Sequence, residues 1–409
     1  MIRHILIRTL AVSTIALLGT RTARAEADAV LVMIPQVFER AASQSERLFD
    51  ATGDSGMIPR TMDKDGRVKL VKAEDWTSGF FPGTLWLIHE FTGSDVWKQR
   101  AMKMTGSLER IRHFKGHHDV GFMLGSSYGH QMRLAPDDKA KAVLLDGAKA
   151  LATRYHEKPG LIRSWDFGPY TYPVIIDNMM NLELLMWAAD HGGDASLREI
   201  SLSHADKTLA NHFRADGSAY HVLDYKPENG AILAIHSRQG RSVLSAWARG
   251  QSWAIYGFTL IYRLTGKAEY LAQARKVADF YRNHPNLPED KVPYWDFGAE
   301  PGNDTPRDAS SAAITASAMI ELAGHLGPEN GKAYLDFAKA QLLSLGSPAY
   351  LAEDGTNGGF LLKHSTGSAP EDSEVDVPLN YADYYFLEAL LRYRAAAGGS
   401  ERAEFATRN

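Results

Sequence analysis

The chain has 409 residues, 44% of them hydrophobic and 23% charged, which is typical of a folded globular protein and excludes a disordered or fibrous one. Its formal net charge of −4 gives no electrostatic reason to expect a nucleic acid or an anionic membrane as a partner. Because the chain has no cysteine, disulfides, thiolate metal sites and cysteine nucleophiles are also excluded.

Residues 1–25 have the pattern of a secretory signal peptide. Arg3 and Arg8 supply positive charge, residues 9–19 form an apolar stretch, and residues 23–25 have the A-x-A form of a cleavage site. A membrane anchor fits less well, because the apolar stretch is shorter than the roughly 20 residues that span a bilayer. We therefore expect cleavage and a location in the periplasm or outside a bacterial cell, without membrane contact.

The remaining residues, 26–409, are predicted to form a single, mostly helical domain. No Pro/Ser-rich linker, low-complexity tract or charge block divides them. Apolar residues recur three and four positions apart in nine stretches, which we expect to be helices: 29–48, 138–155, 174–190, 196–212, 246–264, 268–283, 310–326, 331–345 and 380–396. Between these stretches lie segments rich in Gly, Pro and aromatic residues, which we expect to be loops: 75–83, 117–129, 164–173, 293–306 and 353–360.

The tetrapeptide WDFG occurs twice, at 165–168 and 295–298, each time shortly before a helical stretch. Self-similarity of this kind is typical of a closed array of helical hairpins. The predicted fold class is therefore all-α, a toroid of paired helices whose long aromatic loops gather at one end.

Asp177 is a single carboxylate in the apolar segment YPVIIDNMMNLELLMWAAD, residues 172–190. Pro173 suits the first turn of a helix, so Asp177 is expected near the start of helix 174–190. The helix N-terminus would lower the pKa of this carboxyl, whereas burial among apolar neighbours would raise it. The sequence leaves both a structural and a catalytic role open.

Asp119 stands in the segment HHDVGF, where Gly121 allows close approach of the backbone and His117 and His118 precede the carboxylate. If Asp119 and Asp177 met in one cleft, one carboxyl would keep its proton beside an ionised partner, which is the arrangement that acid/base catalysis needs. The alternative is that Asp119 caps a helix that begins in the 120s.

The segment AWARGQSWAIYG, residues 246–257, alternates Trp247, Arg249, Gln251 and Trp253. A helix spreads these residues over more than one face, so some of them would point out of the core. The set suits a sugar, since aromatic faces bind C–H surfaces and Gln and Arg bind hydroxyls or a carboxylate. The alternative is that Arg249 forms an internal ion pair.

His221, His236 and Gln239 lie in the long connection before that segment. The histidines of the chain have no metal-ligand spacing, and there is no HExxH motif. A G-x-S-x-G elbow and a Gly-rich phosphate loop are also absent. We therefore expect no metal or organic cofactor.

Taken together, the motifs resemble those of the unsaturated glucuronyl hydrolases of glycoside hydrolase family 88, in the order of that family. The matching segments are DWTSGFFPGTLW (75–86), HDVGF (118–122), IDNMMNLELLMWA (176–188), HVLDY (221–225), HSRQG (236–240), WARGQSWAIYGF (247–258), RDASSAAITAS (307–317) and YADYYFLEALLR (381–392). The resemblance implies an (α/α)6 barrel. It also implies an enzyme that hydrates the C4=C5 double bond of the unsaturated uronic acid at the non-reducing end of lyase-made acidic oligosaccharides.

The resemblance further implies roles for individual residues. Asp177 matches the general acid/base, and Asp119 matches the second essential carboxylate. The residues that match substrate-binding positions are Trp76, His118, His221, Gln239, Trp247, Arg249, Gln251, Trp253, Ser365 and Ser368.

Three alternatives remain from the sequence. The related family 105, unsaturated rhamnogalacturonyl hydrolases, uses the same barrel but tends to show R-G-N where this chain has Arg249, Gly250 and Gln251. An inverting glycosidase would place Asp119 and Asp177 about 6.5–9.5 Å apart around a water. A non-catalytic periplasmic glycan-binding protein would use the same aromatic residues without turnover.

Overall fold

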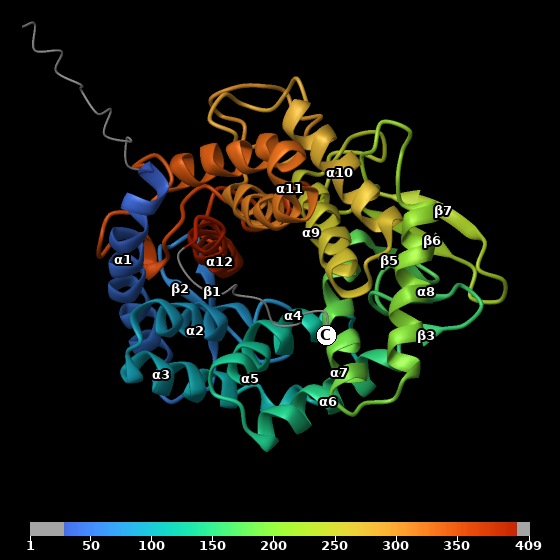
Figure 1. Cartoon of the computed structure of the whole chain (residues 1–409), viewed down its shortest axis with the longest axis horizontal. Helices are drawn as coiled ribbons and strands as arrows, with labels where there is room; N and C mark the ends of the chain where they lie inside the picture. Colours follow the sequence, from blue (N-terminus) through green and yellow to red (C-terminus); the bar gives the residue numbers. More distant parts are fainter. Residues whose placement is uncertain (1–27, 399–409) are drawn as a thin grey trace, which may run out of the picture.

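Two concentric rings of helices surround a common axis in the computed structural model, which describes residues 28–398 (Figure 1). The inner ring consists of α2 (Phe80–Thr92), α4 (Val120–Leu124) with α5 (His130–Leu134), α7 (Leu182–Asp190), α9 (Ala248–Thr265), the first half of α11 (Ala309–Leu345) and α12 (Asn380–Ala396). The outer ring consists of α1 (Ala29–Thr52), α3 (Asp95–Gly106), α6 (Asp138–Ala152), α8 (Ser196–Asn211), α10 (Ala268–Asn283) and the second half of α11. The predicted (α/α)6 barrel is confirmed. The predicted signal peptide, residues 1–25, lies outside the described residues.

The two rings differ in how their helices are buried. Helices α9 and α12 are buried almost all round, whereas α1 and α10 bury one face and expose the other. Helix α11 belongs to both rings because Gly327, with φ of 81°, breaks it just before Pro328. In the range 28–398, no helix is long and apolar enough to cross a membrane.

The lengths of the connections decide where a site can form. Inner helices lead into outer helices through short turns: Gly93 ends α2 and Gly266 ends α9, both in the left-handed conformation, and the next helix begins two residues later. Outer helices lead into inner ones through long segments, which occupy residues 53–79, 107–119, 153–181, 212–247, 284–308 and 346–379. In a ring of up-and-down helices all of these long segments lie at the same end of the barrel.

The strands lie within these long segments. Strands β1 (Ile58–Met62) and β2 (Val68–Val71) form an antiparallel hairpin, and β3 (Tyr155–His156) pairs with β4 (Leu161–Ile162). Strands β5 (Pro173–Ile175), β6 (Val222–Tyr225) and β7 (Ile232–His236) form an antiparallel sheet in that order. This sheet joins the segment before α7 to the segment before α9.

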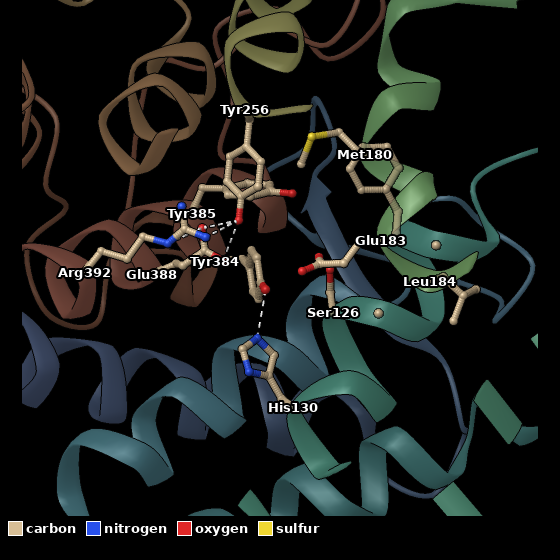
Figure 2. A pocket seen from close by; sticks show the side chains of 13 residues that line it. Ser126, His130, Met180, Glu183, Leu184, Tyr256, Tyr384, Tyr385, Glu388 and Arg392 are labelled. Atoms are coloured by element: carbon tan, nitrogen blue, oxygen red, sulfur yellow. Dashed lines mark hydrogen bonds and ion pairs between the residues drawn. The ribbon is translucent and has the colours of Figure 1, made fainter. Parts of the chain in front are cut away.

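A buried polar network joins three helices of the inner ring, and Figure 2 shows its Tyr256, Glu388 and Arg392 side chains. The hydroxyl of Tyr256 lies 3.1 Å from both carboxylate oxygens of Glu388 and accepts a hydrogen bond of 2.8 Å from Arg392. Arg392 and Arg263 both pair with Glu321, at 2.8 and 2.6 Å. Because these five side chains come from α9, α11 and α12, the network fixes the mutual positions of three inner helices.

Most of the predicted helices are present, but three predictions about the early part of the chain are wrong. Residues 174–190 are not one helix: residues 173–175 form β5, residues 176–181 a 3-10 helix, and α7 begins only at Leu182. Residues 117–129 are not all loop, because α4 and a π-helical turn at Gly125–Gly129 lie there. Helix α2 begins inside the predicted loop 75–83, at Phe80.

Each error has a physical cause. The β-branched residues Val174 and Ile175 pair with Leu223 and Val222, strand partners that are far away in the sequence. In the predicted loops 75–83 and 117–129 the glycines suggest turns, but Gly79 and Gly121 serve close packing. A Cβ on Gly121 would lie 2.5 Å from the Cα of Asn181, so α4 can approach the 3-10 helix only with glycine there.

Candidate active site

A cavity of about 440 Å³ opens among the long segments at one end of the barrel. Both predicted catalytic carboxylates, Asp119 and Asp177, line it. Five of the predicted substrate-binding residues line it as well: Trp76, His118, Gln239, Arg249 and Ser368. The structure therefore brings together residues from five separate parts of the sequence.

Five other predicted substrate-binding residues lie behind the lining of this cavity: His221, Trp247, Gln251, Trp253 and Ser365. His221 accepts hydrogen bonds from the backbone N–H groups of Arg238 and Gln239, and its ring lies 4.4 Å from that of Trp247, tilted by 33°. These two residues thus hold the segment that carries Gln239.

Gln251 has no side-chain atom left for a sugar. Its amide accepts from the backbone N–H of Ala219 and donates to the carbonyls of Ala219 and Trp247. Trp253 packs against Phe122, and Ser365 is paired through its backbone with Val377. These residues support the wall of the cavity. None of them is among the residues that line it, where direct contact with a sugar was expected.

The carboxyl of Asp177 is held by the 3-10 helix Ile176–Asn181, which follows directly on β5. Asp177 is 8% exposed, and its Oδ1 is buried without a hydrogen-bond partner. Burial raises the pKa of Asp177, the charge of Arg249 opposes this rise, and the nearby charge of Asp119 adds to it; the resulting pKa is about 7. At neutral pH this carboxyl is therefore poised between a proton donor and a proton acceptor.

Asp119 is in the opposite state. Its Oδ2 lies 3.1 Å from Nδ1 of His117, and its Oδ1 lies 3.2 Å from Nε2 of His118. Burial opposes ionisation of Asp119, but the two histidines and Arg154 outweigh it and lower the pKa below the ordinary value. The alternative role as a helix cap is not observed, because the side chain makes no capping bond to α4.

His117 was not among the predicted site residues, although it is adjacent to them in the sequence. Its Nε2 donates to the carbonyl of Glu74 at 2.9 Å, so its Nδ1 is left to face Asp119. In the neutral imidazole Nδ1 accepts from the backbone N–H of Asp119, and in the protonated imidazole it donates to the carboxylate. Although burial disfavours the charged ring, the bond to Asp119 raises the pKa of His117.

The Asp177 carboxyl differs from another buried carboxyl, that of Asp383. Burial also raises the pKa of Asp383 to about 7, but each of its oxygens accepts a backbone N–H, from Leu362 and Leu361. Asp383 does not line the cavity. A raised pKa alone therefore does not mark a reactive group, whereas a raised pKa with an unpartnered oxygen in a cavity does.

Arg249 forms the internal ion pair that the sequence left open as its alternative. Its Nη1 lies 3.0 Å from Asp308, and its Nη2 donates to the carbonyl of Gly367 at 2.6 Å. The guanidinium also stacks over the rings of Trp247 and Tyr381. Arg249 nevertheless lines the cavity, so one side chain fixes the loop at 366–367 and places a positive charge near Asp177.

Further lining residues were not predicted, among them Trp165, Phe167, Arg238 and Arg60. Trp165 and Phe167 belong to the first WDFG copy, which the sequence analysis noted only as a repeat. Among residues 28–398, no group of three or more His, Asp or Glu side chains is arranged to hold a metal ion.

Comparison with known proteins decides the family. The chain is 45% identical over 363 residues to the unsaturated glucuronyl hydrolase of Formosa agariphila, a match that covers 88% of this chain and 90% of the relative. The chain belongs to the unsaturated glucuronyl hydrolases of glycoside hydrolase family 88.

Solved structures agree with this assignment to family 88. An unsaturated glucuronyl hydrolase specific for heparin is 43% identical, with a TM-score of 0.87, over 90% of this chain and 98% of that one. An Asp-to-Asn mutant of the unsaturated glucuronyl hydrolase from Streptococcus agalactiae, in complex with dGlcA-GalNAc6S, is 29% identical, with a TM-score of 0.78, over 92% and 93% of the two chains. No protein-family model matches the chain.

These relatives confirm the predicted family and with it a glycoside hydrolase with an oligosaccharide substrate. The family 105 alternative finds no support among them.

We expect Asp177→Asn to change how stability depends on pH. The pKa of Asp177 rises from its ordinary value of 3.8 to about 7 on folding. Between these values the folded protein keeps a proton that the unfolded chain has lost, so wild-type stability falls as the pH rises from about 4 to about 7. Neutral Asn removes this loss, which is on the order of 4 kcal/mol.

Urea unfolding at a series of pH values measures this difference. The control is Asp119→Asn, for which the sign is opposite: because the pKa of Asp119 is lowered, its ionised form stabilises the wild type, and the variant loses stability at neutral pH. Identical pH profiles for wild type and Asp177→Asn would show that Asp177 does not hold a proton at neutral pH.

Proposed function

We propose that Asp177 is the general acid and base of a hydration reaction at the C4=C5 double bond of an unsaturated uronic acid. The protonated Asp177 transfers its proton to C4, and positive charge develops at C5 and the ring oxygen. The resulting Asp177 carboxylate takes a proton from a water molecule, whose oxygen adds to C5. The product is a hemiketal, which opens and releases the rest of the oligosaccharide and a 4-deoxy-5-keto uronic acid.

The observation that carries this proposal is the buried, unpartnered Oδ1 of Asp177 in the cavity. A group that serves first as acid and then as base works best with a pKa close to the working pH, and burial gives Asp177 a pKa of about 7. After it loses its proton, the carboxylate is stabilised by the charge of Arg249.

Asp119 supports the same reaction through its charge. Because His117 and His118 hold it ionised, Asp119 places a fixed negative charge in the cavity where positive charge develops on the sugar ring. It also disfavours early loss of the proton from Asp177. Two carboxyl groups in one cavity thus have different protonation states because their surroundings differ.

We further propose that the substrate is a fragment of a glycosaminoglycan. Support comes from the relatives: the structure with a TM-score of 0.87 is described as specific for heparin, and the Streptococcus agalactiae structure contains dGlcA-GalNAc6S. Residues 26–409 would act as one catalytic domain, and residues 1–25 would direct export. N-terminal sequencing of the protein secreted by the producing cell checks the export.

We expect Asp177→Asn to lower kcat by at least about 10²-fold with little change in KM, because the amide cannot transfer a proton. Loss of the ultraviolet absorbance of the conjugated double bond, followed with lyase-made unsaturated disaccharides, measures the turnover. Asp383→Asn is the matched control: it removes a buried carboxyl with the same raised pKa outside the cavity and leaves turnover intact in folded protein.

Three results would contradict the proposal. Full activity of Asp177→Asn would exclude Asp177 as the general acid. Cleavage of saturated disaccharides at a similar rate would favour an inverting glycosidase. Binding of unsaturated disaccharides by folded wild-type protein without any loss of absorbance would favour a glycan-binding protein.

A further inference from the structure

The arginines that line the cavity differ in how their guanidinium groups are used. Arg60 donates hydrogen bonds from Nε and Nη2 to Glu374 and from Nη1 to Asp75. Arg249 donates from both Nη groups, to Asp308 and to backbone carbonyls. In both of these arginines, every Nη group already donates at least one hydrogen bond inside the protein.

Arg238 is different. Its Nε donates to Glu371 at 3.0 Å, and in the described part of the chain neither of its Nη groups has a hydrogen-bond partner. The side chain is 34% exposed and lines the cavity, so its donors can be reached by a ligand there. Arg238 is thus the lining arginine whose two terminal nitrogens are open to a ligand.

The guanidinium of Arg238 lies over a pair of aromatic rings. The Arg238 Cζ lies 5.4 Å from the ring centroid of Trp165 and 5.0 Å from that of Phe167. The two rings are stacked on each other, 5.4 Å apart and 17° from parallel. Stacking restricts the guanidinium plane, which lowers the entropy that an anion must overcome when it binds.

The backbone of Arg238 is also fixed. Its N–H donates to His221, and the next residue, Gln239, donates from its side chain to the carbonyl of Gly367. The open donors are therefore held in a defined place rather than on a free surface side chain.

This place is near the mouth of the cavity. Phe167, in contact with Arg238, is 54% exposed, whereas Asp177 is 8% exposed. When the unsaturated uronic acid has its double bond at Asp177, the outer part of the cavity holds the sugar that follows it.

We propose that Arg238, supported by Trp165 and Phe167, binds an anionic substituent, a sulfate or a carboxylate, on the sugar that follows the unsaturated uronic acid. This inference rests on the proposed function, because it takes the orientation of the substrate from Asp177. A guanidinium binds such oxyanions through two parallel N–H bonds. Glu371, which shares Arg238 through Nε, competes with the substituent for the same positive charge.

The test compares three unsaturated disaccharides whose second sugar is neutral, sulfated or carboxylated. Arg238→Gln should raise KM about 10-fold or more for the anionic substrate that the site accepts, since charge-assisted hydrogen bonds are lost, and leave kcat and the neutral substrate nearly unchanged. Arg238→Lys should recover part of the loss, because it keeps the charge without the fork. The substrate with the larger change identifies sulfate or carboxylate.

Glu371→Gln should change KM for the anionic substrate in the opposite direction. It removes the competing carboxylate, so KM for the anionic substrate should fall while the neutral substrate is unaffected. A merely structural salt bridge between Arg238 and Glu371 would make both variants worse, and for all substrates alike. Arg241→Gln is the control on the same segment, because Arg241 pairs with Glu300 and does not line the cavity.

Equal KM changes for neutral and anionic substrates, or no change in Arg238→Gln, would overturn the proposal. Failure of the proposed function gives a different result, namely that wild-type protein turns over none of the three disaccharides. In that case calorimetric binding of the same three compounds to wild type, Arg238→Gln and Glu371→Gln still decides whether Arg238 recognises the anionic group.

Discussion

Burial of the Asp177 carboxyl without a partner for Oδ1 is the constraint on which the site depends. A buried ionised carboxylate costs free energy when one of its oxygens accepts no hydrogen bond, so this environment favours the protonated acid. The charge of Arg249 opposes that preference without reversing it, and Arg249 also pairs with Asp308 and two carbonyls. The negative charge of Asp119 also raises the pKa of Asp177, and the resulting pKa is about 7.

The barrel makes this arrangement possible through its connections. Short turns such as those at Gly93 and Gly266 close one end, so the long segments gather at the other. Strands β5 and β6 cross-link two of these segments, and β5 runs directly into the 3-10 helix that carries Asp177. The position of Asp177 is thus fixed by a sheet that is small compared with the rings of helices.

The helical fold and the meeting of Asp119 and Asp177 in one cavity could be predicted from the sequence, but the environment of Asp177 could not. The pattern suggested that a helix N-terminus and burial would act on it in opposite directions. In the structure Asp177 lies in the first turn of the 3-10 helix Ile176–Asn181 rather than in α7, which begins at Leu182, and burial outweighs the influences that lower its pKa. That result depends on the pairing of Val174 with Leu223, a long-range contact that no local pattern reveals.

Residues behind the cavity show a second limit of sequence reasoning. Gln251 and His221 stand in the matching motifs, yet their hydrogen bonds go to backbone groups and hold the segments that form the lining. Arg238 and Phe167 stand beside the predicted residues and line the cavity itself. Motif position identifies the neighbourhood of a site, whereas the direction of each side chain depends on the tertiary packing.

Infrared difference spectroscopy of the substrate-free enzyme shows directly whether the Asp177 carboxyl holds a proton. A protonated carboxyl has a C=O band that a carboxylate lacks, and subtracting the spectrum of Asp177→Asn isolates Asp177 from Asp383, whose pKa is also raised to about 7. We expect the Asp177 band to be present at about pH 5 and to disappear with a midpoint near pH 7. A band already absent at about pH 5 would show that Asp177 is an ordinary ionised carboxylate, and the account of its proton transfer would be wrong.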